Sequence, residues 1–455
     1  MRTTPHQYQI DGVEAMERFG CRALLADQPG LGKTIQSLMI AHRNPESFPM
    51  IVVCPAGLKW NWEAEARKHL GYRVQICEGT KIPAPSKIRA ANIVVVNYDI
   101  LHAWTPYLRS LDPGLVVLDE CHYLRNARTR RTKAVNKLCM GVPKVIAMSG
   151  TPMLKRTAEL YPVLHLLRPD VFPTFHMFAA DYCKRVMTPY GIRYESRNVE
   201  TLNRVMSETL MVRRRKEDVM DQLPAKSRHV VTLGMGASKR YRDGVSKYLE
   251  WEDAHKEKMT ALEYRRQQKE HLSGLKQIVA MDKLPAALEW ADNYLESDSK
   301  LILYAVHRAV VDAVKDRYKS RCVAVTGATI GSKRQAAYVA FNEDKRVRLL
   351  IGNIQAAGCG WNCTSTSTVA FLEMAWAAGD HEQCEDRVHG YKRGLDGVPA
   401  EAYYLVAGGT IDESMCRLLQ RESADVRWAL DGDAPGDGFD LFDRLTNELR
   451  RGLRL

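Results

Sequence analysis

The sequence predicts an α/β protein with two successive domains, each built on a parallel β-sheet that helices cover on both faces. Short apolar runs rich in β-branched residues fall into two groups, and segments with helical periodicity separate the runs. The first group comprises residues 23–26, 50–53, 93–96, 115–118 and 145–148, and the second comprises residues 301–304, 322–325, 348–351, 368–371 and 403–406. Strands that are buried on both faces are typical of parallel sheets whose strands are connected by helices.

The length of 455 residues and the positions of these runs divide the chain into four parts. We expect the first α/β domain at residues 1–175 and the second at residues 285–430. Residues 176–284 between them are charged and mostly helical in pattern, and residues 431–455 read as a basic amphipathic helix that braces the domains. The dense charge at residues 239–283 indicates a solvated helical face in preference to a dedicated contact with a polyanion.

The composition indicates an intracellular protein with a polyanionic partner. Lys and Arg outnumber Asp and Glu by 66 to 54, and the resulting net charge of +12 favours phosphate-rich ligands. No apolar run reaches the roughly 18 residues of a membrane span, and residues 1–5 lack the apolar stretch of a signal peptide. We therefore expect a monomer in the cytoplasm or nucleoid that is not secreted and contacts no membrane.

The 11 cysteines are scattered along the chain, mostly beside apolar runs, as reduced thiols in a hydrophobic core would be. Only Cys359, Cys363, His381 and Cys384 are close enough in sequence to suggest a metal site. Their spacings match no usual zinc module. The sequence therefore favours packing roles for these residues.

A glycine-rich loop follows the first predicted strand. Residues 27–34 read Asp-Gln-Pro-Gly-Leu-Gly-Lys-Thr, and a helical segment comes next. Gly30 and Gly32 allow backbone N–H groups to approach phosphates, and the start of the helix adds partial positive charge. Lys33 can reach the outer phosphates of ATP, and the Thr34 hydroxyl suits Mg²⁺. The loop therefore predicts a nucleotide site that uses ATP and Mg²⁺.

Two carboxylates end the fourth predicted strand. Asp119 and Glu120 directly follow residues 115–118, about 85 residues after the loop. We predict that Asp119 holds Mg²⁺ and that Glu120 orients and deprotonates the attacking water. Pairs of acids after an apolar strand are common by chance, so it is the loop upstream that makes this pair significant.

Taken together, these motifs resemble the helicase-like ATPases of superfamily two, specifically the DNA translocases of the Swi/Snf type. Residues 27–34 resemble the family loop DEMGLGKT, which accounts for Asp27 where the strict loop pattern has glycine. Residues 119–122 resemble the DEAH-type box, and residues 8–13 resemble the N-terminal motif of the family. The resemblance implies that Gln9 binds the adenine edge and that Asp27 belongs to the nucleotide site.

The resemblance also implies residues that contact DNA or couple it to the nucleotide. Trp60 lies in a segment similar to the family pattern "CP…NW…E", which implies a DNA-backbone contact. Trp60, Trp62 and Trp361 could also stack on bases, but packing in the core or at a hinge is the stronger interpretation because a duplex hides its base faces. Ser149 and Thr151 belong to a Ser-Gly-Thr-Pro motif that links nucleotide state to DNA. His122 either couples the nucleotide site to this motif or makes a local hydrogen bond.

The second domain carries the remaining motifs in the family order. Residues 355–362 resemble the family loop KAAGVGLNL, which implies that Gln355 and Gly358 contact DNA and nucleotide. Residues 383–389 resemble QAEDRAH. The matches extend from about residue 5 to residue 415 and imply two tandem RecA-like domains. The compact arrangement looks most like the annealing-helicase (HARP-like) branch.

The second domain also has to supply positive charge to the γ-phosphate as it is transferred. We predict that Arg387 does so, with a structural salt bridge as its alternative role. The family motif has a second arginine three residues later, where this chain has Gly390. Because an arginine finger contributes about 10³ to 10⁵ in rate, Gly390 predicts slow hydrolysis or a substitute such as Lys392 or Arg393.

One basic segment keeps two interpretations. Residues 213–216 read Arg-Arg-Arg-Lys and resemble the family segment "RRxKxDV". The segment either binds DNA phosphates or packs at the interface between the domains.

The sequence thus predicts an ATP-dependent motor that moves along double-stranded DNA. Contacts to phosphates rather than to base edges suit a motor that runs over any sequence. One alternative is a helicase that separates strands, or the motor of a restriction-type translocase. An alternative from another class is a weakly hydrolysing DNA-binding clamp, which Gly390 suggests. The absence of chromatin-reading modules favours a bacterial or phage source.

Overall fold

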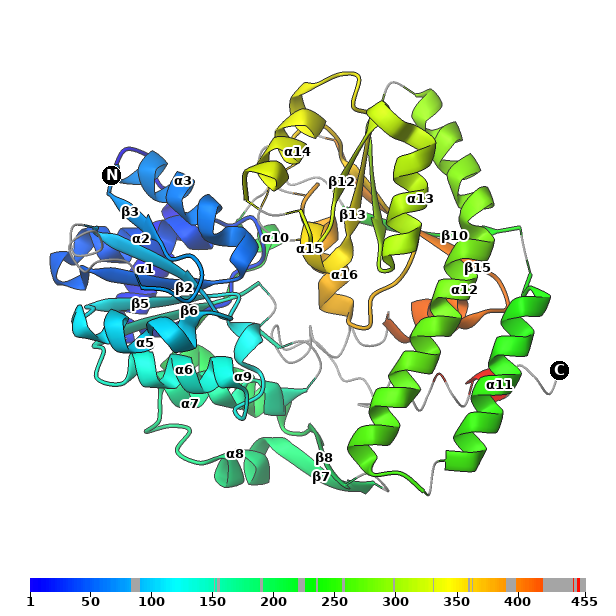
Figure 1. Cartoon of the computed structure of the whole chain (residues 1–455). Helices are drawn as coiled ribbons and strands as arrows, with labels where there is room; N and C mark the ends of the chain where they lie inside the picture. The colour runs from blue at the N-terminus through cyan, green and yellow to red at the C-terminus, as the bar shows by residue number, and fades with distance from the viewer. Residues whose placement is uncertain are drawn as a thin grey trace. The chain divides into compact units, whose positions relative to one another are not determined.

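The computed structural model describes residues 1–82, 91–150, 152–153, 156–188, 191–219, 226–234, 236–255, 258–297, 299–329, 331–358, 361, 363–389, 398–419, 445 and 448–450. The described residues form two compact units (Figure 1). Unit 1 contains Met1–Lys184 and Tyr194–Leu223, and unit 2 contains Arg185–Arg193 and Pro224–Asp425.

Unit 1 is built on a seven-stranded sheet in which every neighbouring pair of strands is parallel. In spatial order the strands are β3 (Val74–Ile76), β4 (Ile93–Asn97), β2 (Met50–Cys54), β5 (Leu115–Asp119), β6 (Lys144–Met148), β1 (Arg22–Leu25) and β9 (Met211–Val212). Because the strands are parallel, β1 and β5 end at the same edge of the sheet. The phosphate loop and the two carboxylates follow these strands.

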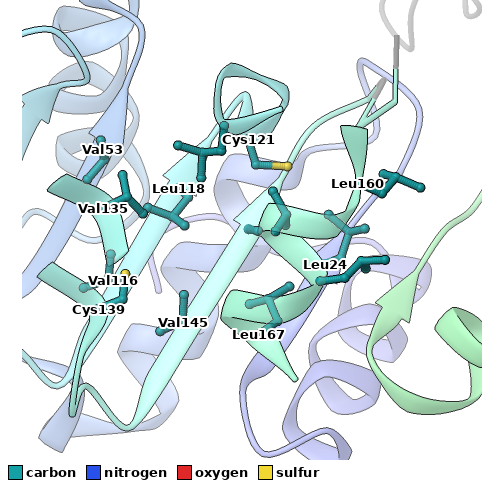
Figure 2. Close-up of a cluster of buried hydrophobic side chains, with 14 of the residues drawn as sticks. Leu24, Val53, Val116, Leu118, Cys121, Val135, Cys139, Val145, Leu160 and Leu167 are labelled. Carbon is teal, nitrogen blue, oxygen red and sulfur yellow. The ribbon is translucent and has the colours of Figure 1, made fainter. Parts of the chain in front are cut away.

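Successive side chains of each strand in unit 1 enter two different apolar cores. In β5, Val116 and Leu118 lie in one core, whereas Leu115 and Val117 lie in the other. Figure 2 shows the first of these cores, where Leu118 faces Val135 of a covering helix. Burial on both faces explains the unbroken β-branched runs in the sequence.

Helices cover both faces of this sheet (Figure 1). The first core is covered by α5 (Leu101–Ser110), α6 (Arg130–Cys139), α7 (Tyr161–Leu167), α8 (Phe175–Tyr182) and α9 (Val199–Thr209). The second core is covered by α1 (Gln7–Arg18), α2 (Lys33–Arg43) and α3 (Lys59–His69). The short α10 (Lys216–Val219) follows β9.

Unit 2 is built on a six-stranded sheet whose neighbouring strands are also parallel. In spatial order the strands are β10 (Lys226–Leu233), β15 (Ala400–Ala407), β14 (Thr368–Phe371), β11 (Leu301–Ala305), β13 (Leu349–Asn353) and β12 (Cys322–Val325). Its helices include α11 (Lys239–His255), α12 (Ala261–Glu296), α13 (Arg308–Tyr318), α14 (Gly331–Glu343), α15 (Ile354–Ala357) and α16 (Ala378–Glu385). The sequence-based prediction of two parallel α/β sheets is confirmed.

The interval 176–284 contributes to both units. Its two longest helices, α11 and α12, pack side by side (Figure 1), as the charged helical pattern predicts. Tyr248 of α11 and Leu272 of α12 lie in the core that the two helices share. The interval also holds β9, β10 and the two-stranded sheet of β7 (Cys183–Thr188) and β8 (Gly191–Ser196), which the pattern does not predict. These strands are short or lie at sheet edges, where an apolar run is not required. The limits of the four predicted parts remain a prediction.

Most of the predicted C-terminal helix, residues 431–455, lies outside the described residues. Leu445 and Leu449 are buried beside α11, and Arg450 forms ion pairs with Glu252 and Asp253 of that helix. None of the helices within the described ranges has the length and apolarity needed to cross a bilayer.

Candidate active site

The loop between β1 and α2 has the backbone conformation that its glycines predict. Gly30 and Gly32 have φ values of 94° and 76°, in the left-handed region that favours glycine. α2 begins at Lys33, so the first N–H groups of that helix lie at the loop. The Lys33 ammonium donates to the backbone oxygen of Asp27 at 2.7 Å, and Thr34 follows in the first turn of α2. These features are suited to binding phosphate oxygens.

Gln9 of α1 packs directly against this loop. It is only 5% exposed, and its amide nitrogen donates to the backbone oxygen of Leu31 at 3.3 Å. A β-carbon on Gly32, whose backbone is left-handed, would lie 2.4 Å from that nitrogen, so a larger residue would be strained and would displace the Gln9 side chain. The predicted adenine reader is therefore placed at the loop, with its amide oxygen accepting from the backbone N–H of His6 at 3.0 Å.

Asp27, the first residue of the loop, is fully buried, and its carboxylate holds the loop through Arg214 and Gln36. It forms an ion pair with Arg214 and accepts a hydrogen bond from the backbone N–H of Arg214 at 3.0 Å. The side chain of Gln36 on α2 donates to the same carboxylate at 2.9 Å. These contacts show how an aspartate stabilises the loop at this position.

Asp119 ends β5 and is buried. It is 8% exposed and accepts a hydrogen bond from the indole nitrogen of Trp62 at 2.8 Å. Burial and the neighbouring charge of Glu120 raise the pKa of Asp119 to about 7, even though Trp62 and Lys33 favour its ionised form. A cation beside Asp119 would relieve the repulsion between the two carboxylates.

Glu120 is held in place by residues of two motifs. Its backbone is left-handed, with φ 53°, a conformation that is rare for residues other than glycine. Its carboxylate accepts a hydrogen bond from Ser149 at 2.9 Å and lies 3.1 Å from Nδ1 of His122. Burial alone would raise the pKa of Glu120, but His122, Lys33 and Ser149 lower it to about 2. Glu120 is therefore ionised at neutral pH.

The same contacts give His122 and Ser149 a shared position. Nδ1 of His122 and the hydroxyl of Ser149 are 3.1 Å apart. Gly150, the next residue, is so close to the phosphate loop that an added β-carbon would lie 2.6 Å from Cγ of Pro29. The Ser-Gly-Thr-Pro motif is thus in contact with both carboxylate and loop. Thr151, also predicted to act here, lies outside the described residues.

The donor set fits a magnesium ion bound together with a nucleotide. The described residues contain no group of three or more His, Cys, Asp and Glu side chains that would hold a metal ion by themselves. Asp119 and the Thr34 hydroxyl are hard oxygen donors, and Mg²⁺ commonly takes few protein ligands together with phosphates and waters. Of the four residues considered for a zinc site, His381 accepts a hydrogen bond from the backbone N–H of Ala375, and Cys359 lies outside the described residues.

Arg387 of unit 2 is anchored within its own unit. Its guanidinium donates to the backbone oxygens of Gln383 at 3.0 Å and Trp361 at 2.9 Å. These bonds hold the side chain close to Trp361. Gly390, Lys392 and Arg393 lie outside the described residues, so the role of Arg387 and the consequence of Gly390 remain predictions.

The other predicted contact residues differ in exposure. Trp60 is 43% exposed on α3, and Gln355 is exposed on α15. Gly358 is buried where α15 meets α16, and a β-carbon there would lie 2.9 Å from Sγ of Cys384. Trp361 is buried and stacks on Tyr338 with ring centroids 4.4 Å apart. Packing explains Trp361 and Gly358, whereas Trp60 and Gln355 are accessible to a ligand.

A buried charged cluster supports the QAEDRAH-like segment in unit 2. Glu385 is 1% exposed and accepts two hydrogen bonds from Arg228 of β10, both at 2.7 Å. The hydroxyl of Tyr404 donates to Glu385 at 2.8 Å, and Lys226 is 3.0 Å away. Burial opposes ionisation of Glu385, but Lys226 and Arg228 lower its pKa to about 2. The cluster fixes the helix that precedes Arg387.

His381 in this region predicts that acid destabilises unit 2. Burial lowers the pKa of His381 to about 4. Between pH 6.5 and pH 4 the unfolded chain therefore binds a proton that the folded chain does not, and stability falls as the pH falls. From pH 7 to pH 5 we expect a loss of about 2 kcal/mol from this group.

Urea unfolding of unit 2 at the two pH values measures this loss. The glutamine in His381→Gln can still accept a hydrogen bond from the backbone N–H of Ala375, but it cannot titrate. The fall in the free energy of unfolding from pH 7 to pH 5 should therefore be about 2 kcal/mol smaller in this variant. An unchanged pH dependence in the variant would show that other groups cause it.

Sequence reasoning missed the residues that hold the site in place. Trp62 is bound to Asp119, and Arg214 is bound to Asp27, although these pairs are 57 and 187 positions apart. The only sequence signal for them is membership of the NW and RRxKxDV segments. Neither segment shows by itself which carboxylate it contacts.

Comparison with known proteins places this geometry in context. Residues 8–284 match the family model described as the SNF2-related domain. The SWI/SNF-related matrix-associated actin-dependent regulator of chromatin subfamily A-like protein 1 of Xenopus tropicalis is 31% identical over 91% of this chain and 44% of its own length. DNA annealing helicase and endonuclease ZRANB3 of Bos taurus is 28% identical over 93% of this chain and 40% of its own length. The chain therefore spans less than half of the length of these relatives.

One solved structure that this chain matches is the Sulfolobus solfataricus SWI2/SNF2 ATPase core in complex with double-stranded DNA. It is 22% identical, covers 96% of this chain and 98% of its own chain, and has a TM-score of 0.45. The two relatives named above are animal proteins and give no support to a bacterial or phage source. Their names confirm the resemblance to Swi/Snf-type proteins and to the annealing-helicase branch.

Proposed function

Because the chain belongs to the family of the SNF2-related domain, we propose that it is an ATP-dependent motor that moves along double-stranded DNA. The observation that carries the proposal is the set of contacts that joins the phosphate loop to the two carboxylates and to Ser149 in unit 1. Such a set supplies phosphate binding, a cation ligand and an ionised carboxylate for the attacking water. Hydrolysis of a nucleoside triphosphate needs all three.

Each residue of unit 1 has a role in this proposal. Lys33 and the N–H groups after Gly32 bind the phosphates, and Gln9 reads the adenine. Asp119 and Thr34 hold Mg²⁺, which neutralises charge on the phosphates when bound. Glu120 orients the attacking water and accepts its proton.

Ser149 and His122 give the proposed motor a way to sense the nucleotide. Both are in contact with Glu120, and Gly150 packs on Pro29 of the loop. A change at the phosphates can therefore move the Ser-Gly-Thr-Pro motif directly, because the motif is in contact with both Glu120 and the loop. A motor needs such a link in order to convert hydrolysis into a change of its affinity for DNA.

Double-stranded DNA is the proposed track for two reasons. The net charge of +12 favours a polyanion. Relatives named DNA annealing helicase support DNA as the ligand. Trp60 and Gln355, which are exposed, are proposed to contact the DNA, and Arg387 is proposed to deliver positive charge to the γ-phosphate.

ATP turnover measured with duplex DNA, single-stranded DNA and no DNA tests the proposal. We expect strong stimulation by duplex DNA and little by single strands. A preference for single strands would indicate a strand-separating helicase. The absence of turnover would indicate the DNA-binding clamp that Gly390 suggests.

A further inference from the structure

The basic segment after β9 runs alongside the phosphate loop, residue by residue. β9 pairs with β1, and the pairing continues beyond the strands. The backbone N–H of Ala26 donates to the oxygen of Val212 at 2.7 Å, and that of Gln28 donates to the oxygen of Arg214 at 3.1 Å. Residues 211–216 therefore follow the chain from β1 into the loop.

The side chains of this segment fasten it to the loop. Arg213 donates to the backbone oxygen of Ala26 at 2.8 Å, and Arg214 is ion-paired with Asp27. The backbone N–H of Lys216 donates to the side-chain oxygen of Gln28 at 2.9 Å. These contacts fix the backbone of Lys216 beside the loop.

The Lys216 side chain lies over Gly30. Lys216 is only 3% exposed, and a β-carbon placed on Gly30 would lie 3.5 Å from its Cε and 3.8 Å from its Nζ. Gly30 is one of the two left-handed glycines of the phosphate loop. An ammonium group thus lies against the loop from outside the loop sequence.

We propose that Lys216 is a second phosphate-binding lysine of the nucleotide site. Its ammonium donates to an oxygen of the bound polyphosphate on the Gly30 side of the loop, and Lys33 binds from the first turn of α2. The inference rests on the proposed function, because it needs ATP to occupy this loop. It also gives the segment of residues 213–216 a role: Arg213 and Arg214 position the loop, and Lys216 contacts the ligand.

The rival explanation is that Lys216 is structural and only packs its aliphatic stem on Gly30. Arg215 provides a matched control within the same segment. Its side chain is 39% exposed and pairs with Glu217 at 2.8 Å and Asp218 at 3.0 Å. Loss of its charge should therefore not affect the nucleotide.

Calorimetric binding of ATP, ADP and adenosine to the full chain tests the inference. For Lys216→Met we expect the Kd of ATP and of ADP to rise about tenfold, as loss of one charge-assisted contact predicts. Adenosine binding should not change, because adenosine has no phosphate. Lys216→Arg should restore much of the affinity, and Arg215→Gln should behave as the unaltered protein.

The outcomes separate this inference from the proposed function. If the unaltered protein fails to bind ATP, or if Lys33→Ala binds ATP as tightly as the unaltered protein, the proposed nucleotide site is wrong. If these controls behave as expected but Lys216→Met binds ATP and ADP normally, the lysine is structural and the inference is overturned. An equal loss of affinity for adenosine in Lys216→Met would overturn it as well.

Discussion

Replacement of Glu120 with Gln is expected to lower duplex-stimulated ATP turnover by about 10³-fold, within the range for loss of a general base. Glu120 is ionised and held by Ser149 and His122, so it can orient a water molecule and accept its proton. Glutamine keeps the size of the side chain and can still accept from Ser149, but it cannot take a proton. Binding of ATP should persist, because the phosphate loop is unchanged.

Ser149→Ala is the matched control for this substitution. It removes one hydrogen bond to Glu120 but leaves the carboxylate, so turnover should fall far less than in Glu120→Gln. Steady-state turnover and ATP binding measured on both variants show whether Glu120 is the group that activates the water. Normal turnover in Glu120→Gln would show that another group activates the water.

Replacement of Arg214 with Met is expected to lower the free energy of unfolding of unit 1 by about 3 to 5 kcal/mol, as for other broken buried ion pairs. The substitution leaves the carboxylate of Asp27, which is fully buried, without its cation. Gln36 would remain as a donor to that carboxylate. Chemical denaturation of the unaltered and substituted proteins measures the loss.

A double-mutant cycle separates the ion pair from simple loss of packing. Asp27→Asn removes the buried charge, so the combination of Asp27→Asn and Arg214→Met should cost less than the sum of the two single substitutions. Strict additivity of the two effects would contradict the account of Asp27 as the buried partner of Arg214.

Much of the fold is predictable from the sequence because the central strands are buried on both faces. All five predicted strands of unit 1 and all five of unit 2 are present in the structure. Of the missed strands, β3, β9 and β10 lie at the ends of the two large sheets, and β7 and β8 pair with each other in a separate sheet. β9 has only two residues, and β10 alternates little and is largely exposed, so its place is set by pairing with β15 rather than by its own pattern.

The chemical groups of the site can be predicted from the sequence, whereas the residues that support them cannot. The loop of residues 27–34 and the Asp119–Glu120 pair are contiguous motifs, so their residue types alone predict their chemistry. The supports of the site come from far along the chain: Trp62 for Asp119, Arg214 for Asp27 and Lys216 for Gly30. Such pairs depend on the strand order of the folded sheet, which single-chain motifs do not contain.

Displacement of a third strand from a DNA triplex measures movement along the duplex most directly. We predict that the protein displaces the third strand when ATP is present, and that displacement stops with a non-hydrolysable analogue or with Glu120→Gln. Duplex-stimulated ATP turnover without displacement of the third strand would contradict the central claim that the protein is a motor on double-stranded DNA.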